Sequence, residues 1–399
     1  MAEIALLPRR LAEWSGAPPR WYPLQLGGCQ HDANRRALGD GNHKISRLPQ
    51  ATEYQEEPPE EKSQEHSTSV SSSRFDVRDD SMTTSLFCLL LLLASRVSGA
   101  HNSCARSFVA SFPDSSRGRE VSVTLCLPNP RATVLLVFAH GGGLFAEDYA
   151  YVDSLSAHGT AVARLISSCD DPPCPADGLE PMALDLSFLT TTLLQQNAHN
   201  ESSPLFQQLS PNAVCFLAGH SMGAAAAVLA AATNFTRTTR LAGIIALAPG
   251  LFDQQQTCVV CHARYVVVRS LIIVGDQDCV PQSMLNTTPL PLFRNMTSAK
   301  EKALVVVTGA NHCGWSSPVK GDCTWDGNCG DMARPEQEAL ALSLISAFTA
   351  TLSGSWAAFS ASLEAGRLRK EWQYLTEASD HAAALHDRCA NCTNATISG

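Results

Sequence analysis

The stretch "CFLAGHSMGAAAAVLAAA", Cys215 to Ala232, decides how the chain is interpreted. An apolar segment typical of a buried strand leads into the motif G-H-S-M-G at 219–223, and an alanine-rich segment typical of a helix follows. A bare G-x-S-x-G match is common in a chain rich in glycine, alanine and serine. Ser221 is therefore either a nucleophile on a tight strand-to-helix turn or an ordinary serine in a glycine-rich turn. The rest of the chain has to decide between the two.

The sequence around this stretch alternates apolar strands with helical segments. We expect strands at 121–128, 132–140, 161–166, 213–220, 241–250, 269–278 and 302–312, and helices at 178–197, 222–233 and 334–352. Continuous apolar strands separated by helices are typical of a mainly parallel sheet with helices on both faces. We therefore predict an α/β fold for residues 101–353.

A helical C-terminal tail is expected over residues 354–399. The apolar side chains between Trp356 and Leu375 recur at a spacing that suits an amphipathic helix within 355–388. We expect this helix to pack on the domain. Contact with a second copy of the chain or with a membrane surface is the alternative, and the oligomeric state stays open.

The bulk composition excludes some functions. The chain has 399 residues, 45% of them hydrophobic, and a formal charge of −9 at pH 7. Nucleic-acid binding needs a basic face, so an acidic chain argues against that class of partner. The length suffices for one large core.

The N-terminal 100 residues fall into two parts. Residues 1–81 are polar and too poor in apolar side chains to bury a core, so we expect disorder or a start codon assigned too far upstream. Residues 82–100 resemble a secretory signal peptide, with an apolar run from Leu86 to Ala94 and small residues before His101. That run is about half of the roughly 20 residues that a membrane span needs. We therefore expect a secreted or lumenal protein without a stable membrane span.

Sequons and paired cysteines support secretion. Sequons for N-glycosylation lie at Asn200, Asn234, Asn286, Asn295, Asn391 and Asn394. Close cysteine pairs that could form disulfides are Cys169 with Cys174, Cys258 with Cys261, Cys323 with Cys329 and Cys389 with Cys392, and Cys104 with Cys126 is a further candidate. Zinc is the less favoured alternative for the two C-x-x-C pairs, and calcium for the acidic segment with Asp322, Asp326 and Asp331. We expect no metal and no cofactor.

Four expected strands end in groups that could act together. His140-Gly141-Gly142-Gly143 follows one strand and Ser221 another, while Asp278 and His312 follow the last two. Active sites of open parallel sheets lie beyond the carboxyl ends of the strands, so these groups are expected at one edge. Their order along the chain, Ser, Asp, His, is the order that α/β-hydrolases use.

Each group has an expected role in acyl transfer. Ser221 would be the nucleophile, His312 the general base, and Asp278 the carboxylate that orients the histidine, with Asp276 as its rival. The Met222 N–H and one N–H from Gly142, Gly143 or Leu144 would bind the oxyanion. Leu144, Met222, Phe145 and Trp315 are apolar candidates for the substrate pocket.

The cysteines beside the proposed acid and base suggest a further bridge. Cys279 follows Asp278 and Cys313 follows His312, so their loops must be adjacent if the triad forms. We therefore predict a Cys279–Cys313 disulfide. Cys215, inside the strand before Ser221, then remains as a buried free thiol.

The segments "FAHGGGLFAEDYAYVDSLSAHGTAVA", "LAGHSMGAAAA", "IIVGDQDCVP" and "GANHCGW" resemble one branch of the α/β-hydrolases. This branch holds chlorophyllases, cutinase-like polyester hydrolases and platelet-activating-factor acetylhydrolases, and the resemblance covers residues 120–352. Its H-G…Y…L…H-G pattern matches His140, Tyr149, Leu155, His158 and Gly159. Chlorophyllases have an arginine where this chain has Met222, which argues against chlorophyll as substrate. Polyester hydrolases of the branch can carry a disulfide that joins the acid and histidine loops.

The sequence thus predicts a secreted serine hydrolase that cleaves carboxylic esters through an acyl-enzyme. The expected substrate is a small-molecule, lipid or polymer ester. A thioesterase or peptidase of the same fold and a non-catalytic binding protein on this fold are the alternatives.

Overall fold

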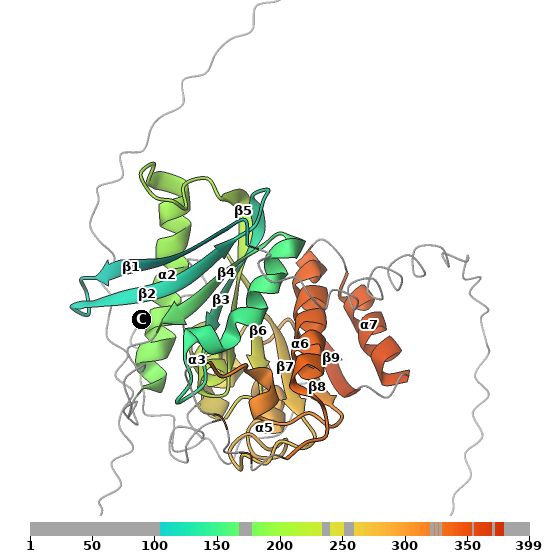
Figure 1. Ribbon diagram of the computed structural model, residues 1–399. Helices are drawn as coiled ribbons and strands as arrows, with labels where there is room; N and C mark the ends of the chain where they lie inside the picture. Colours follow the sequence, from blue (N-terminus) through green and yellow to red (C-terminus); the bar gives the residue numbers. More distant parts are fainter. Residues whose placement is uncertain are drawn as a thin grey trace, which may run out of the picture.

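The computed structural model describes residues 104–166, 178–233, 240–250, 259–319, 323, 326, 329–352, 355–368 and 372–378. The strands in these residues form one nine-stranded mixed sheet with the order β1-β2-β4-β3-β5-β6-β7-β8-β9 (Figure 1). The strands are β1 (Arg106–Asp114), β2 (Arg119–Leu127), β3 (Ala132–Ala139), β4 (Thr160–Ile166), β5 (Leu209–His220), β6 (Leu241–Leu247), β7 (Arg269–Gly275), β8 (Glu301–Val307) and β9 (Trp372–Ala378). Strands β3 to β8 pair in parallel in the order β4-β3-β5-β6-β7-β8, and β1, β2 and β9 add antiparallel edges. The predicted α/β class with a mainly parallel sheet is confirmed.

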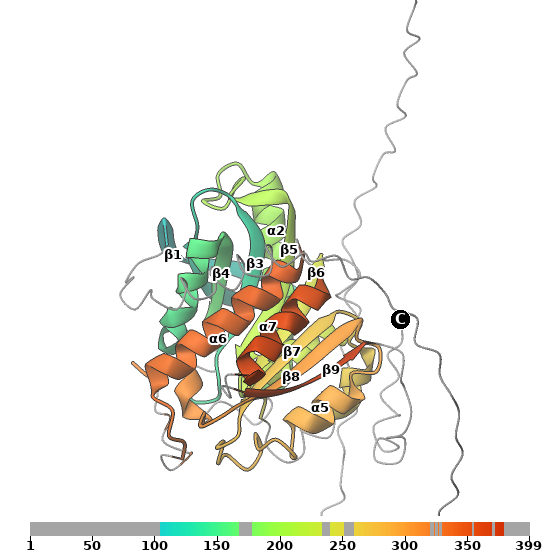
Figure 2. The ribbon, with the colours of Figure 1, turned by 90° about the vertical axis from the view of Figure 1, so that its right-hand side faces the viewer.

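Helices cover both faces of the sheet. The longer ones are η1 (Ala146–His158), α2 (Leu179–His199), α3 (Met222–Ala231), α5 (Pro289–Asn295), α6 (Arg334–Thr349) and α7 (Trp356–Leu368), and the short 3-10 turns are η4 (Ala263–Tyr265), η5 (Cys313–Trp315) and η6 (Ala350–Leu352). One apolar cluster joins the sheet to α2, α3 and α5, and a second joins it to η1, α6 and α7. Figure 2 shows α6 and α7 lying across the second face.

The alanine run in the stretch Cys215 to Ala232 forms helix α3 and matters for the fold because its side chains are small. All ten residues of α3 are buried. Strands β5 and β6, which the helix packs against, are buried over their C-terminal halves because both of their faces are covered. Small side chains let α3 approach the sheet closely, and this fixes the residue at its N-terminus relative to the strand ends.

The C-terminal tail differs from the expected helix. Helix α7 ends at Leu368, and Trp372–Ala378 forms strand β9, antiparallel to β8. The prediction of a helix through 355–388 is therefore wrong over 372–378. Trp372 is buried, Gln373 is exposed and Tyr374 is half-buried, an alternation that suits an edge strand better than a helix. Helix α7 agrees with the predicted helix over 356–368, and residues 379–399 of the predicted tail lie outside the described residues.

The N-terminal edge of the sheet was also missed. Strand β1 pairs with β2 as a hairpin over its whole length. Phe108, Ala110 and Phe112 are its half-buried residues and alternate with exposed ones, so a period of two was present in the sequence. The signal is weak because the apolar residue Val109 lies on the exposed face and interrupts the alternation of apolar and polar residues.

Several predictions about processing lie outside the described residues. These are the upstream segment 1–81, the signal peptide 82–100 and the sequons at Asn234, Asn391 and Asn394. Of the other sequon asparagines, Asn286 is exposed, and Asn200 and Asn295 are half-buried. None of the helices in the described segments is long and apolar enough to cross a membrane.

Candidate active site

The carboxyl ends of four strands bring the candidate residues to one edge of the sheet. Strands β3, β5, β7 and β8 belong to the parallel part of the sheet and point the same way. The segments that follow them carry the glycine loop at 141–143, Ser221, Asp278 and His312. Parallel strands end at one edge, so four segments far apart in the sequence converge there.

Ser221 has an unusual backbone conformation. Its φ is 52° and its ψ is −118°, at the junction where β5 ends and α3 begins. A non-glycine residue with positive φ is strained by roughly 1–3 kcal/mol and persists only where its surroundings hold it. Here the Ser221 N–H donates to the Leu247 carbonyl at 2.9 Å, across to the neighbouring strand.

The glycines on either side of Ser221 make this turn possible. A Cβ at Gly219 would lie 2.4 Å from the Gly223 backbone, and one at Gly223 would lie 2.3 Å from the Ala139 carbonyl oxygen. Both neighbours are main-chain atoms and cannot swing aside. Only glycine at these two positions lets strand, turn and helix approach this closely.

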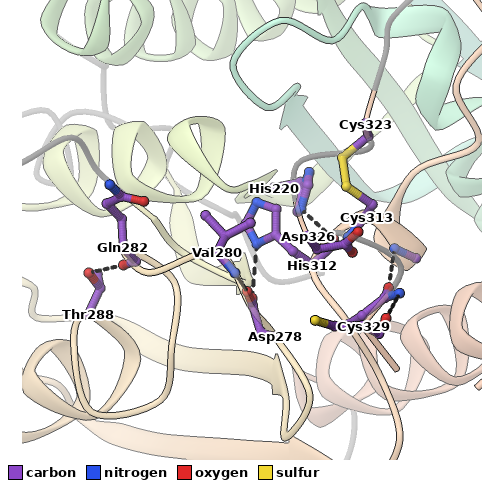
Figure 3. Close-up of polar contacts among 12 residues, drawn as sticks. His220, Asp278, Val280, Gln282, Thr288, His312, Cys313, Cys323, Asp326 and Cys329 are labelled. Atoms are coloured by element: carbon purple, nitrogen blue, oxygen red, sulfur yellow. Dashed lines mark hydrogen bonds and ion pairs between the residues drawn. A yellow bond between two sulfur atoms is a disulfide. The ribbon is translucent and has the colours of Figure 1, made fainter. Parts of the chain in front are cut away.

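His312 and Asp278 form a buried pair. The distance between His312 Nδ1 and Asp278 Oδ2 is 2.9 Å, and the exposed fractions of the two side chains are 0% and 1% (Figure 3). The other Asp278 oxygen accepts the Val280 N–H at 3.0 Å. Because the carboxylate accepts from Nδ1, the neutral imidazole carries its proton there and presents Nε2 as an acceptor.

Nε2 of His312 is a buried acceptor with no hydrogen-bond partner among the described residues. Ser221 lies at the same edge of the sheet, but it does not hydrogen-bond to His312 Nε2. Contacts between a nucleophile and its base are often long without substrate.

Asp276, the alternative acid, has a different partner. It is exposed, and its Oδ1 accepts the Gly309 N–H at 2.7 Å, which caps the turn after β8. Of the two carboxylates, only Asp278 hydrogen-bonds to His312.

The loop that carries His312 is held from several directions. The Gln337 side chain on α6 binds both backbone groups of Asn311: its Oε1 accepts the N–H at 3.1 Å and its Nε2 donates to the carbonyl at 2.7 Å. Asp326 accepts the Cys313 N–H at 3.0 Å. The sequence analysis did not single out Gln337, since no local pattern marks a glutamine that acts on a loop 26 residues earlier.

Two disulfides also hold the acid and histidine loops, but they do not pair as predicted. Cys279 is bonded to Cys329, and Cys313 to Cys323. The predicted Cys279–Cys313 and Cys323–Cys329 bridges are therefore wrong. Cys323 is bonded to the histidine loop at Cys313 (Figure 3), and Cys329 is bonded to the acid loop at Cys279, so two cysteines later in the chain each take one bond from a different loop.

The cysteines elsewhere agree with the predictions where the structure describes them. Cys104–Cys126 is a disulfide, and Cys215 is a buried free cysteine, so both predictions are confirmed. Cys261 is disulfide-bonded, which removes its sulfur as a zinc ligand.

Three of the predicted cysteine pairings are not tested by the structure. Cys258, the expected partner of Cys261, lies outside the described residues. The same holds for Cys169 and its expected partner Cys174, and for Cys389 and its expected partner Cys392. The bridges Cys169–Cys174, Cys258–Cys261 and Cys389–Cys392 therefore stay predictions.

No described cluster has free metal ligands. The cluster of Cys104, Cys126 and Asp153 has suitable spacing for a metal ion, but its two sulfurs are bonded to each other. In the acidic segment considered for calcium, Asp326 binds the Cys313 N–H, and Asp322 lies outside the described residues.

Backbone N–H groups face the same edge as Ser221. Met222 is the first residue of α3, so its N–H is one of the helix donors that lack an intrahelical acceptor. In the glycine loop, the Leu144 N–H donates to the Gly141 carbonyl at 3.2 Å. Neither Gly142 nor Gly143 donates its N–H to any described residue. Of the three residues predicted to supply an oxyanion donor, Gly142 and Gly143 are therefore better candidates than Leu144.

The residues proposed to line a pocket lie in different surroundings. Phe145 is half-buried, and Met222 is 9% exposed with its side chain about 4 Å from where a Cβ of Gly142 would be. Leu144 and Trp315 are wholly buried in the second apolar cluster, where they act as core side chains.

Ser283 is a further residue near Ser221. A Cβ at Gly250 would lie 2.0 Å from Ser283 Oγ and 3.6 Å from Ser221 Oγ, so the two hydroxyls flank this glycine. Ser283 Oγ is buried and has no hydrogen-bond partner in the described part of the chain. A side chain at position 250 would therefore collide with the Ser283 hydroxyl unless Ser283 moved.

Comparison with known proteins assigns no family: no protein-family model matches this chain, and no curated protein matches it. The geometry of the described residues is therefore the basis for any functional assignment.

Proposed function

We propose that this protein is a serine hydrolase that cleaves carboxylic esters through an acyl-enzyme, on an α/β-hydrolase fold. The observation that carries the proposal is the buried Asp278–His312 pair at the same sheet edge as Ser221, which sits on a strained turn. Backbone strain at a serine between a strand and a helix is a feature of nucleophile turns. The strand order, with antiparallel β2 beside a parallel sheet, also fits this fold.

The proposed reaction follows from the hydrogen bonds of His312. Nδ1–H donates to Asp278, so Nε2 can take the proton of Ser221 Oγ as the oxygen attacks the ester carbonyl. The Met222 N–H and a glycine-loop N–H stabilise the oxyanion that forms. His312 then gives its proton to the leaving alcohol. In the second half His312 takes a proton from water as the water oxygen attacks the acyl carbonyl, the bond to Ser221 Oγ breaks, and the proton returns to Oγ as the carboxylic acid leaves. Asp278 stays ionised and stabilises the imidazolium.

We also propose that the protein acts in an oxidising compartment. Disulfides such as Cys104–Cys126, Cys279–Cys329 and Cys313–Cys323 persist in secreted and lumenal proteins. Glycosylation at Asn286, which is exposed, fits the same location. Treatment of the native protein with an N-glycosidase is expected to increase its electrophoretic mobility.

A fluorophosphonate probe and a panel of p-nitrophenyl esters test the catalytic proposal. The full chain, produced through a secretory pathway, should be labelled by the probe and should hydrolyse at least one ester. Ser221→Ala should lose both, whereas Ser298→Ala, which removes an exposed serine, should keep both. Labelling that persists in Ser221→Ala, or a wild type that neither reacts nor hydrolyses any ester, contradicts the proposal. A matched thioester in the panel separates the two substrate classes.

A further inference from the structure

A chain of hydrogen bonds links three of the segments that meet at the site. The Gly141 N–H donates to Tyr149 Oη at 3.0 Å, and Tyr149 Oη lies 2.6 Å from His220 Nδ1. At the other end of the ring, His220 Nε2 lies 3.1 Å from the His312 carbonyl oxygen (Figure 3). The chain therefore runs from the glycine loop, through the residue before Ser221, to the backbone of the base. We call Tyr149 and His220 together the relay.

The protons in the relay can be arranged in one way only. A carbonyl only accepts, so His220 carries its proton on Nε2. Burial, together with the nearby His312, holds the pKa of His220 well below its usual range, so the ring is neutral and Nδ1 accepts. Tyr149 must then donate to Nδ1 while its oxygen accepts from Gly141. Burial raises the pKa of Tyr149, which keeps that proton on the hydroxyl.

The glycine loop is shaped around the relay. A Cβ at Gly141 would lie 3.0 Å from His220 Nδ1 and 3.1 Å from Tyr149 Oη, so a side chain there would press on the hydrogen bond between them. The Tyr149 ring packs against Phe138 with centroids 5.0 Å apart, and both residues are buried in the second apolar cluster. Packing therefore fixes one end of the relay to strand β3.

Neither relay residue can touch a substrate, because both are fully buried. Their influence passes through the two backbone groups that they bind, one on the oxyanion side and one on the base side. The rings of His220 and His312 lie 4.7 Å apart between centroids. A neutral His220 therefore adds no like charge beside His312 when that ring takes the proton of the nucleophile.

We propose that Tyr149 and His220 are positioning residues, which hold the glycine loop and the His312 loop in register so that oxyanion donors and base act on one carbonyl. This inference rests on the proposed function. It predicts that the relay contributes to the rate of the chemical step and little to substrate binding, since a misplacement of about 1 Å between catalytic groups lowers kcat strongly.

Substitutions can interrupt the relay at different points. Tyr149→Phe removes the hydroxyl and so both of its hydrogen bonds. His220→Asn keeps an acceptor near the position of Nδ1 but loses the donor to His312, and His220→Gln keeps a donor near Nε2 but loses the acceptor for Tyr149. Tyr151→Phe is the matched control: Tyr151 lies in η1, and its hydroxyl donates to the Trp315 carbonyl at 2.9 Å, outside the relay.

The experiment measures kcat and KM for the best ester and the rate of fluorophosphonate labelling, each on the full chain. We expect Tyr149→Phe to lower kcat and the labelling rate about 10- to 100-fold, with KM within about threefold of wild type. Tyr151→Phe should lose comparable thermal stability, since each variant loses buried hydroxyl bonds, but it should keep kcat within about threefold. The two His220 variants should both lower kcat.

The outcomes distinguish a failure of the positioning role of the relay from a failure of the proposed function. If Ser221→Ala abolishes labelling but Tyr149→Phe behaves like Tyr151→Phe, the relay has no positioning role and the hydrolase proposal stands. A rise in KM without a fall in kcat also overturns the relay, because it would indicate a binding defect. If the wild type has no hydrolase activity, both proposals fall. Should Tyr149→Phe not fold, the two His220 variants make the same comparison.

Discussion

The turn at Ser221 and the loop at His312 are held in place by different means. Ser221 depends on its own backbone, on the glycines two residues away on each side, and on one hydrogen bond to Leu247. The His312 loop depends on side chains from distant segments, among them Gln337, Asp326 and His220, and on a disulfide at Cys313. The turn is therefore encoded locally and the loop by long-range contacts.

This difference indicates which positions of the protein tolerate substitution. A locally encoded turn fails when one of a few consecutive residues changes, because its neighbours are main-chain atoms. A loop held by many separate contacts loses part of its restraint with each substitution. The predictions below test that contrast, beginning with the largest expected effect.

Substitutions of the two carboxylates Asp278 and Asp276 should differ most in their effect on kcat. Asp278→Asn replaces the buried acceptor of Nδ1–H and is expected to lower kcat by about 10³- to 10⁴-fold with the fold retained. Asp276→Asn weakens only the cap of an exposed turn and should change kcat little. Steady-state ester hydrolysis and circular dichroism on both variants make the comparison. Equal losses of kcat would contradict the assignment of Asp278.

Removal of the disulfides should weaken the long-range restraint. Cys279–Cys329 spans 50 residues and Cys313–Cys323 spans 10, so the chain-entropy relation gives about 4 and about 3 kcal/mol of stability respectively. Paired Cys→Ala variants, unfolded in urea, measure these contributions. Peptide mapping of the native protein tests the pairing itself, and a Cys279–Cys313 peptide would contradict it.

Substitution of one glycine in the Ser221 turn and one in the His312 loop tests how differently the two are held. The Cβ of Gly223→Ala would meet a backbone oxygen at 2.3 Å, whereas that of Gly314→Ala would meet the end of the Gln337 side chain at the same distance. We expect Gly223→Ala to cost about 3 kcal/mol or more and Gly314→Ala clearly less, because a side-chain amide can shift. Gly142→Ala, whose nearest neighbour is 3.9 Å away, serves as the control in thermal unfolding. Equal losses of stability in Gly223→Ala and Gly314→Ala would contradict the proposed difference between the turn and the loop.

His220 should make stability depend on pH. Its pKa is depressed in the folded state, mainly by burial, so the unfolded chain binds a proton there at a higher pH than the folded chain does. Stability from this group is complete above about pH 6.5 and is lost as the pH falls, by up to about 1.4 kcal/mol per pH unit. Urea unfolding between pH 7 and pH 5 should therefore show a steeper loss for wild type than for His220→Asn. Parallel slopes would show that His220 does not titrate as described.

The smallest effect is expected at Cys215. Burial raises the pKa of its thiol to about 12, so it should not react with iodoacetamide while the protein is folded. Labelling in denaturant, read by mass spectrometry, should find Cys215 modified. Rapid modification of the native protein would contradict its burial beneath the turn.

Much of the fold and part of the site could be predicted from local patterns. The central strands and helices α2, α3 and α6 follow from apolar runs and spacing, and the positions of Ser221, Asp278 and His312 follow from where strands end. Strand β9 could not be separated from a helix, because its apolar residues suit either period and its pairing with β8 is a tertiary contact.

The support of the site was largely invisible in the sequence. Tyr149 was noted as part of a family-like pattern and His220 as part of the turn, but their hydrogen bond joins residues 71 apart. The pairing of Cys313 with Cys323 depends on which cysteines the fold brings together, which their spacing in the sequence does not determine. Local patterns therefore predict the candidate catalytic residues, while only the folded chain shows which contacts hold them in place.

The clamp of Gln337 on Asn311 also bears on the order in which the protein is made. A chain leaving the ribosome contains Ser221, Asp278 and His312 before it contains helix α6, and the backbone of Asn311 has no glutamine to bind until then. Strand β9, which closes the sheet beside β8, emerges later still. If the proposed function holds, a nascent or truncated chain that stops before α6 should carry all three proposed catalytic residues and yet remain inactive, because the support of the Asn311 backbone is added only with α6.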